Sequence, residues 1–181
     1  MTLKMLLHVL GFIVSIPARI KGMKFARGAF IGPGYDWLFV QLTNISLGEN
    51  VLIGRRAWIC TLGDGAILIG KGTSIGRDAT IAASKRISIG NNVLVSYGVS
   101  FLDHDHEFRS LDAPPIMQGI TPGEEISVGD NCFIGARSFV LKGVSLGRHC
   151  VVGANSVVTS TFPEGSLIAG NPARLIRRLG C

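Results

Sequence analysis

Two histidines, His104 and His106, lie one residue apart in the middle of the chain, within a run of acidic residues. An imidazole titrates near neutral pH, so it can take a proton from a hydroxyl group that is about to react. A neighbouring carboxylate can fix the tautomer of the imidazole and raise its basicity. The carboxylates available for this role are Asp78, Asp103, Asp105 and Glu107. The run therefore predicts a site for general-base catalysis, with either histidine as the base.

The chain around this run is built from a repeat. A tetrapeptide of the form apolar–any–apolar–Gly recurs at residues 45–48, 67–70, 87–90, 126–129 and 144–147. Aliphatic residues also return every sixth position, as at Val128, Ile134 and Val140. A period of six fits neither an amphipathic helix nor a single long strand. It predicts a coil with three flat faces and roughly 18 residues per circuit, whose circuits pair as parallel strands around an aliphatic core.

Asparagine recurs where two faces of this coil would meet. Asn50, Asn92, Asn131 and Asn155 each occupy such a corner of the repeat. Asparagine and glycine tolerate a positive φ better than other residues do. We therefore expect tight turns with left-handed backbone at these corners.

The repeat is interrupted once, between Phe101 and Ile126. In a compact domain, a long segment without structure of its own is usually functional or disordered. This segment contains both His104 and His106 and follows directly from a core strand. We therefore expect residues 103–125 to protrude as a functional loop after the third full circuit.

The repeat divides the chain into three parts and makes the fold class mainly β. Residues 29–170 form the predicted β-helix domain, residues 1–28 an N-terminal helical arm, and residues 171–181 a basic tail with a short helix. The apolar run 5–16 is shorter than the about 20 residues that span a bilayer, and no small-residue cleavage site follows it. Because basic residues follow the run, the arm could lie on an anionic membrane surface. It could equally cap the open end of the core or pack between subunits.

Charge and cysteine content exclude several classes of function. The net charge is +6, but the basic residues crowd at the two ends and the middle of the chain is nearly neutral. This distribution argues against a track that binds nucleic acid. The four cysteines form no CxxC pair, which predicts neither a disulfide framework nor a zinc site. We expect reduced, buried thiols in a cytoplasmic protein, which would lie at the inner face of the membrane if the arm binds lipid.

Residues 45–170 resemble the hexapeptide-repeat acyltransferases, whose fold is a left-handed parallel β-helix. The chain is most similar to the branch of maltose, galactoside and polysaccharide O-acetyltransferases, because the run Ala169-Gly-Asn-Pro-Ala-Arg174-Leu-Ile-Arg177 is similar to the signature that closes those proteins. The resemblance implies direct transfer of an acetyl group from acetyl-CoA to a hydroxyl of a sugar or a polysaccharide precursor, without a metal. It also implies a homotrimer in which neighbouring subunits share each active site.

The resemblance further implies roles for single residues at the start of the loop. His104 matches the position of the family's catalytic histidine, and His106 is the alternative. Asp103 or Asp105 would orient the imidazole.

Coenzyme A lies between subunits in this family, which implies six contact residues here. These are Ala136, Ala154, Thr159, Ser160, Arg174 and Arg177. Ser160 stands where a lysine is common, so one phosphate contact differs from the family. Asp78 stands where close relatives use an asparagine to hold the sugar. Asp78 is thus the expected acceptor-binding residue, but the identity of the acceptor does not carry over.

Three other functions remain open from the sequence. N-acetylation of an amino sugar would use the same donor and the same base. A γ-type carbonic anhydrase shares the β-helix but needs three convergent histidines, and this chain offers His104 and His106 without a well-placed third, since His149 falls on another circuit. A non-catalytic β-helix scaffold would need neither the loop nor the C-terminal signature. Bound zinc would favour the anhydrase, and a lack of acyl-CoA binding would favour the scaffold.

Overall fold

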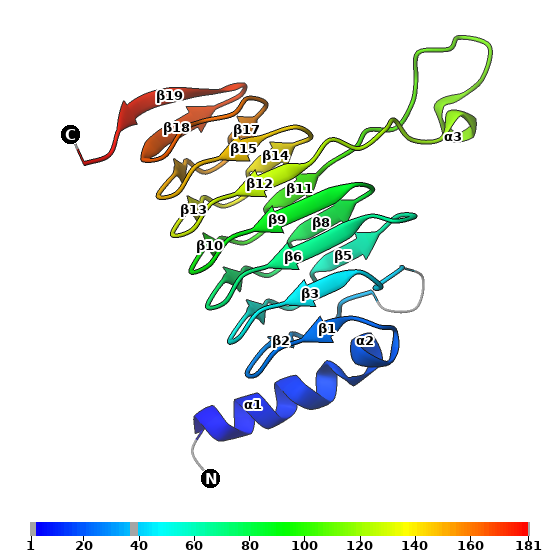
Figure 1. Ribbon diagram of the computed structural model, residues 1–181. Helices are drawn as coiled ribbons and strands as arrows, with labels where there is room; N and C mark the ends of the chain where they lie inside the picture. The colour runs from blue at the N-terminus through cyan, green and yellow to red at the C-terminus, as the bar shows by residue number, and fades with distance from the viewer. Residues whose placement is uncertain (1–2, 37–39, 181) are drawn as a thin grey trace.

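The protein is a parallel β-solenoid with three sheets, as shown by a computed structural model that describes residues 3–36 and 40–180 (Figure 1). Each circuit of the chain, here called a rung, contributes one short strand to sheet A, one to sheet B and one to sheet C. The predicted mainly-β parallel coil is confirmed.

The strands are short because each face of the coil is only one repeat unit long. Sheet A contains β1 (Lys24–Phe25), β3 (Ile45–Leu47), β6 (Ala66–Ile69), β9 (Arg86–Ile89), β12 (Ile126–Val128) and β15 (Ser145–Leu146). Sheet B contains β2 (Phe30–Ile31), β4 (Leu52–Ile53), β7 (Ser74–Ile75), β10 (Leu94–Val95), β13 (Phe133–Ile134), β16 (Val151–Val152), β18 (Ser166–Gly170) and β19 (Ala173–Arg178). Sheet C contains β5 (Trp58–Thr61), β8 (Thr80–Ala83), β11 (Ser100–Leu102), β14 (Phe139–Leu141) and β17 (Val157–Val158).

The core is a set of stacked aliphatic columns inside the solenoid. Ile134 pairs in register with Val152, and Val140 pairs with Val158, as the six-residue period predicts. All four side chains are fully buried. Burying one such side chain contributes about 1.5–3 kcal/mol, so the stacked columns supply most of the stabilisation that a solenoid can obtain.

Three cysteines lie in or next to this core as free, buried thiols: Cys60, Cys132 and Cys150. Burial raises the pKa of the Cys60 thiol to about 11. The predicted burial is confirmed for these three, and Cys181 lies outside the described residues.

The corners between the sheets are tight turns with left-handed backbone. Asn50, Asn92, Asn131 and Asn155 all have φ between 53° and 58°, as predicted for their places in the repeat. The turn from sheet A to sheet B is called the AB turn below, and the other two are the BC turn and the CA turn.

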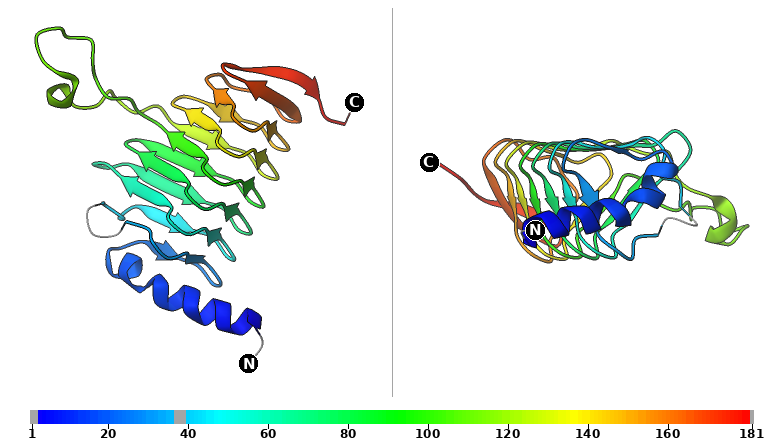
Figure 2. Two further views of the ribbon diagram at one scale, coloured as in Figure 1. Left: turned by 180° about the vertical axis from the view of Figure 1, so that it is seen from behind. Right: turned by 90° about the horizontal axis from the view of Figure 1, so that it is seen from below.

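The N-terminal end of the solenoid is covered by α1 (Leu3–Val14) and α2 (Ile16–Ile20). Figure 2 shows α1 lying across this end, where it packs against β2. Between the helices, the Ser15 hydroxyl donates to the Gly11 carbonyl over 2.6 Å and accepts the Ile31 N–H over 3.1 Å. The first strand of sheet A, β1, begins within the segment predicted as the arm. Among the helices of the described chain, none is long and apolar enough to cross a membrane.

The C-terminal end differs from the prediction of a short helix in residues 171–181, which is wrong. Residues Ala173–Arg178 form β19, which turns back and pairs antiparallel with β18. A strand at the end of a solenoid leaves unpaired backbone N–H and C=O groups. The returning strand pairs with these groups along β18, which a helix could not do.

The predicted loop 103–125 protrudes from the body of the solenoid (Figures 1 and 2). It leaves the solenoid after β11, at the end of the third complete rung, and contains the short helix α3 (Pro115–Gln118).

Candidate functional site

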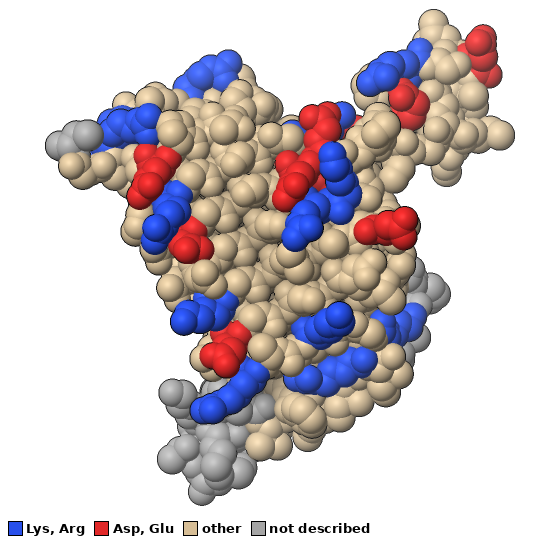
Figure 3. Space-filling view, in the orientation of Figure 1, with Lys and Arg blue, Asp and Glu red and all other residues tan. Residues whose placement is uncertain are grey.

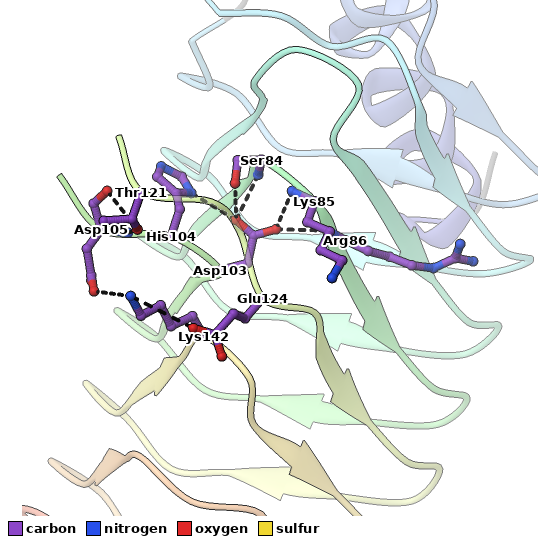
Figure 4. A network of polar contacts seen from close by, with 9 residues as sticks. All are labelled: Ser84, Lys85, Arg86, Asp103, His104, Asp105, Thr121, Glu124 and Lys142. Atoms are coloured by element: carbon purple, nitrogen blue, oxygen red, sulfur yellow. Dashed lines mark hydrogen bonds and ion pairs between the residues drawn. The ribbon is translucent and has the colours of Figure 1, made fainter. Parts of the chain in front are cut away.

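His104 and Asp103 form a paired side-chain unit at the base of the loop (Figure 4). The Nδ1 atom of His104 lies 2.8 Å from Oδ1 of Asp103. The Asp103 side chain is fully buried, and that of His104 is 10% exposed. One carboxylate therefore holds the imidazole from inside the protein, and a small part of the ring remains accessible.

The Asp103 carboxylate is held by the turn of the preceding rung. Its Oδ1 accepts hydrogen bonds from the backbone N–H of Ser84 (2.7 Å) and from the Ser84 hydroxyl (3.2 Å). Its Oδ2 accepts from the backbone N–H groups of Lys85 (2.8 Å) and Arg86 (2.9 Å). Since β8 and β11 pair in register and Ser84–Arg86 follow β8, this CA turn lies directly beside Asp103.

The charge of Asp103 determines which nitrogen of His104 carries a proton. Burial opposes ionisation of this carboxyl, but the hydrogen bonds from Ser84, His104 and Lys85 outweigh it and place the pKa of Asp103 below its ordinary value. An ionised carboxylate can only accept hydrogen bonds, so Nδ1 of His104 is the donor. In the neutral imidazole the other nitrogen, Nε2, then carries no proton and can accept one from another molecule.

The neighbouring Asp105 and His106 do not join this pair. Asp105 forms an ion pair with Lys142 over 2.8 Å, and its backbone N–H donates to the Thr121 hydroxyl over 3.1 Å. His106 is exposed and forms an isolated backbone bridge with Ile120 across the base of the loop. Of the carboxylates named from the sequence, the structure brings Asp103 to His104.

Lys142 connects the loop to the rung that follows it. It comes directly after β14 and contacts Glu124 over 4.0 Å as well as Asp105 (Figure 4). The Glu124 backbone N–H also donates to the Asp103 carbonyl over 2.8 Å. Both ends of the loop are therefore fixed close to His104. A groove of about 440 Å³ runs beside them and is lined in part by Ser84 and Thr121.

The residues assigned to coenzyme A lie in two separate groups within one chain. Ala136 and Ala154 stack in BC turns, where the Asn155 N–H donates to the Ala136 carbonyl over 2.9 Å. Thr159 and Ser160 follow β17 at the other end of sheet C, on the side of the CA turns. The structure therefore does not bring the two groups together within a single subunit.

The two predicted arginine contacts also separate. Both lie on β19, where Arg174 pairs with Ala169 towards the BC turns and Arg177 pairs with Leu167 at the opposite edge of sheet B. Arg174 thus lies on the side of Ala154, and Arg177 does not.

Asp78, the predicted acceptor contact, lies in a BC turn before β8, whereas His104 follows β11. Since β8 and β11 are parallel neighbours, the two residues lie at opposite ends of sheet C. The Asp78 carboxylate accepts two hydrogen bonds from Arg56, over 2.7 Å and 2.8 Å. This pairing places the pKa of Asp78 below its ordinary value.

Two features of the site were absent from the sequence prediction. The backbone donors of Ser84–Arg86 have no signature in residue type, because any residue can supply a backbone N–H. Lys142 could have been suspected only from the register that places it beside the loop. Within residues 3–36 and 40–180, no group of three or more His, Cys, Asp or Glu side chains could hold a metal ion.

A search against protein-family models agrees with the repeat. The model "Hexapeptide repeat of succinyl-transferase" matches residues 44–83 and 125–160. These two segments flank the third rung and the loop, which the model does not match.

Named relatives extend the similarity over most of the chain. The protein WbbJ of Escherichia coli, whose name describes a lipopolysaccharide biosynthesis O-acetyl transferase, is 31% identical over 142 residues, which cover 75% of this chain and 72% of WbbJ. The protein CapG of Staphylococcus aureus is 36% identical over 145 residues, which cover 78% of this chain and 77% of CapG. Rv3034c of Mycobacterium tuberculosis, named as an acetyltransferase, is 30% identical over 82% of this chain, but the chain spans only 49% of that protein.

Solved structures show the same fold. A hexapeptide-repeat acetyltransferase from Vibrio cholerae, solved with acetyl coenzyme A, superposes with a TM-score of 0.59 at 24% identity, covering 88% of this chain and 70% of that one. An N-acyltransferase from Bacillus cereus, AntD, superposes with a TM-score of 0.73 at 16% identity, covering 90% of this chain and 87% of that one. With the repeat, the solenoid and relatives such as WbbJ and CapG in agreement, the chain belongs to the hexapeptide-repeat acetyltransferase family.

Proposed function

We propose that the protein transfers an acetyl group from acetyl-CoA to a hydroxyl group of a sugar, in the synthesis of a lipopolysaccharide or a capsule. The observation that carries this proposal is the Asp103–His104 pair at the base of the loop, in which a fully buried carboxylate lies 2.8 Å from Nδ1 of His104. The name of WbbJ supports the acetyl group and an acceptor in lipopolysaccharide synthesis, and the Vibrio cholerae structure with acetyl coenzyme A supports the donor.

His104 acts as the general base in this reaction. Its Nε2 takes the proton of the acceptor hydroxyl while the hydroxyl oxygen attacks the thioester carbonyl carbon. The carbon–sulfur bond breaks, and the departing sulfur of coenzyme A receives the proton from the imidazolium. The products are the O-acetylated sugar and free coenzyme A. The fully buried charge of Asp103 stabilises the imidazolium between the two proton transfers.

Each active site lies between two subunits of a cyclic homotrimer. Ala136 and Ala154 lie in BC turns, while His104 and Thr159 lie at the opposite edge of sheet C. One coenzyme molecule that contacts both groups must therefore bind between two chains. Asp78 would meet the acceptor in the same way, from the subunit opposite His104.

The arm holds the enzyme at the cytoplasmic face of a membrane. Its exposed apolar side chains are Val9, Leu10, Phe12, Ile13, Ile16 and Ile20. Three exposed basic residues follow: Lys21, Lys24 and Arg27. An apolar surface beside basic side chains suits the interface of an anionic bilayer, where a lipid-linked acceptor would also be found.

The test of the proposed function measures acetyl-CoA binding by calorimetry and acceptor-dependent release of coenzyme A. The acceptor panel contains neutral sugars, amino sugars and phosphorylated sugars, and the proteins are the wild type and His104→Ala. The proposal predicts that both proteins bind acetyl-CoA and that only the wild type releases coenzyme A with a hydroxyl acceptor. If neither protein binds acetyl-CoA, the proposal is wrong; if only amino sugars are acetylated, O-transfer is wrong.

A further inference from the structure

The BC turns form two continuous columns of residues along one edge of the solenoid. Backbone hydrogen bonds join each turn to the next: Asp78 N–H to the Arg55 carbonyl (3.0 Å), Gly98 N–H to the Arg77 carbonyl (2.9 Å) and Arg137 N–H to the Tyr97 carbonyl (3.0 Å). Residues in consecutive turns are therefore stacked at the spacing of neighbouring strands, which is about 4.8 Å.

Four exposed arginines occupy these stacked turns and are called the arginine ladder: Arg55, Arg56, Arg77 and Arg137. The acidic residue in these BC turns is Asp78, which forms an ion pair with Arg56 over 2.7 Å. The second contact of Asp78, with Arg77, is longer at 3.7 Å. These turns thus carry four guanidinium groups and one carboxylate, which leaves this edge positive.

Two of the four arginines, Arg56 and Arg137, occupy backbone positions that are unfavourable for arginine. Arg56 and Arg137 have φ of 56° and 57°, in the left-handed region that L side chains rarely adopt. At the same place in the AB turns the chain mostly uses asparagine or glycine, which tolerate this conformation, as at Asn50, Gly72 and Asn92; His149 is the exception. Non-glycine residues held in this region cluster at functional sites.

Tyr97 lies between two members of the ladder. The guanidinium groups of Arg77 and Arg137 are each 5.6 Å from the centre of its ring. The Tyr97 side chain is itself exposed at 42%. Contact with the ring restrains two long side chains whose charged ends remain available to solvent.

The AB turns show that the repeat itself does not require positive charge. The matching positions there, each directly before the residue with positive φ, are Arg27, Glu49, Lys71, Asn91, Asp130, Arg148 and Glu164. Apart from the neutral Asn91, their charges alternate in sign, and Figure 3 shows acidic and basic side chains alternating along one edge of the molecule. These AB positions thus hold three basic and three acidic residues, whereas the BC turns hold four arginines and one aspartate.

We infer that the arginine ladder is a binding site for a diphosphate group, carried by the acceptor. The planar donors of arginine match phosphate oxygens, and guanidinium groups on adjacent rungs can contact two linked phosphates at once. This inference rests on the proposed function, because the ladder surrounds Asp78, the expected acceptor contact. It names the acceptor class as a sugar joined through a diphosphate to a nucleoside or a lipid.

Coenzyme A also carries a diphosphate, and Ala136, an expected coenzyme contact, lies next to Arg137 in the same BC turn. The diphosphate of the acceptor and that of coenzyme A are expected at different places along the BC edge. The expected coenzyme contacts lie in the C-terminal rungs, whereas Arg55, Arg56 and Arg77 lie in the first two complete rungs.

Calorimetry with uridine diphosphate, inorganic pyrophosphate and coenzyme A tests the site on the wild type, on Arg55→Gln/Arg77→Gln and on the matched control Arg148→Gln. The inference predicts that the double variant binds uridine diphosphate and pyrophosphate at least tenfold more weakly, while the control binds them as the wild type does. The Kd for coenzyme A should change less than twofold. Equal weakening in the control, or weakening for coenzyme A alone, overturns the inference.

Turnover separates this inference from the proposed function. If the wild type acetylates neutral sugars and pyrophosphate neither binds nor inhibits, the ladder site is wrong and the transferase stands. If uridine diphosphate binds through the ladder but no acceptor releases coenzyme A, the proposed function is wrong and the diphosphate site remains.

Discussion

The CA turn that carries the loop and the BC turns of the ladder hold charged groups in different ways. Asp103 is fully buried and is held by three backbone N–H groups, a hydroxyl and an imidazole. The arginines of the ladder are exposed, and Arg56 and Arg77 each have 53% of the side chain accessible. A buried charge with many fixed partners sets the protonation of one neighbour, whereas exposed charges attract a ligand and are screened by salt. Under the proposed function, the CA turn would carry the chemical step and the BC turns would bind the ligand.

The largest effect expected from this division is on kcat. His104→Ala should lower kcat by about 10²–10⁴-fold, since the general base is lost. His106→Ala is the matched control and should change kcat less than about threefold, because that ring is exposed and apart from the Asp103–His104 pair. Steady-state release of coenzyme A measures both. Equal losses in the two variants would show that the loop, rather than His104, is required.

Asp103→Asn should lower kcat by about 10²-fold or more while acetyl-CoA binding is retained. The amide keeps the shape of the side chain but removes the charge that stabilises the imidazolium. By contrast, Arg77→Gln in the ladder should raise KM for a diphosphate-linked acceptor and leave kcat nearly unchanged. A rise in KM from Asp103→Asn, or a loss of kcat from Arg77→Gln, would contradict the division between the two turns.

The stability of the protein should depend on pH through Asp103. Its folded pKa lies below the ordinary value, so its contribution to the free energy of unfolding is complete above the unfolded pKa of about 3.9 and is lost as the pH falls through the folded pKa. Urea unfolding between pH 7 and pH 3 should show this loss in the wild type. Asp103→Asn should be less stable by about 1–3 kcal/mol at pH 7, because an amide cannot accept from all the backbone donors. Its stability should also fall less on acidification.

Ionic strength should have a smaller effect, which distinguishes the exposed arginine ladder from the buried Asp103. Raising the ionic strength should weaken binding of uridine diphosphate several-fold, because the ladder is exposed and charges in solvent are screened over about 8–10 Å. The value of kcat at saturating substrate should hardly change, because the Asp103 carboxylate is buried. Parallel titrations of Kd and kcat with sodium chloride make the comparison, and a kcat that falls in step with Kd would be the contrary result.

Lys142→Met should have the smallest effect. The ion pair of Lys142 with Asp105 is partly exposed, so its loss should cost about 0–1 kcal/mol of stability. A several-fold decrease in kcat/KM is expected because the base of the loop is held less firmly near His104. Lys142→Arg should keep most of the wild-type kcat/KM. Lys85→Met removes a side chain but keeps the backbone donor to Asp103, so its kcat/KM should resemble that of the wild type.

The repeat made most of the fold predictable. Each inward position, such as Ile134 above Val152, stacks on its equivalent one rung away, so a six-residue period in the sequence translates directly into the register of the strands. The same regularity located the loop, because the period stops at Phe101 and resumes at Ile126. The last strand, β19, was mispredicted because it runs antiparallel and lies outside the repeat.

The site was predictable in residue type but not in pairing. His104 was identified by its place at the start of the loop, yet the choice between Asp103 and Asp105 depended on backbone N–H groups of Ser84–Arg86 that no sequence pattern marks. The arginine ladder was hidden for a different reason. Its members are spread between residues 55 and 137 in a stretch whose charges nearly cancel, and only the stacking of the rungs brings them to one edge.

The most direct test of the central claim is the tautomer of His104, measured by NMR on protein labelled with nitrogen-15 in histidine. Comparison with His104→Ala assigns the His104 signals. Above the pKa of the imidazole, the account predicts that Nδ1 carries the proton and Nε2 is free, and that Asp103→Asn shifts this balance towards protonated Nε2. A wild-type His104 with its proton on Nε2 would contradict the account, because Asp103 would then not hold the ring as a base.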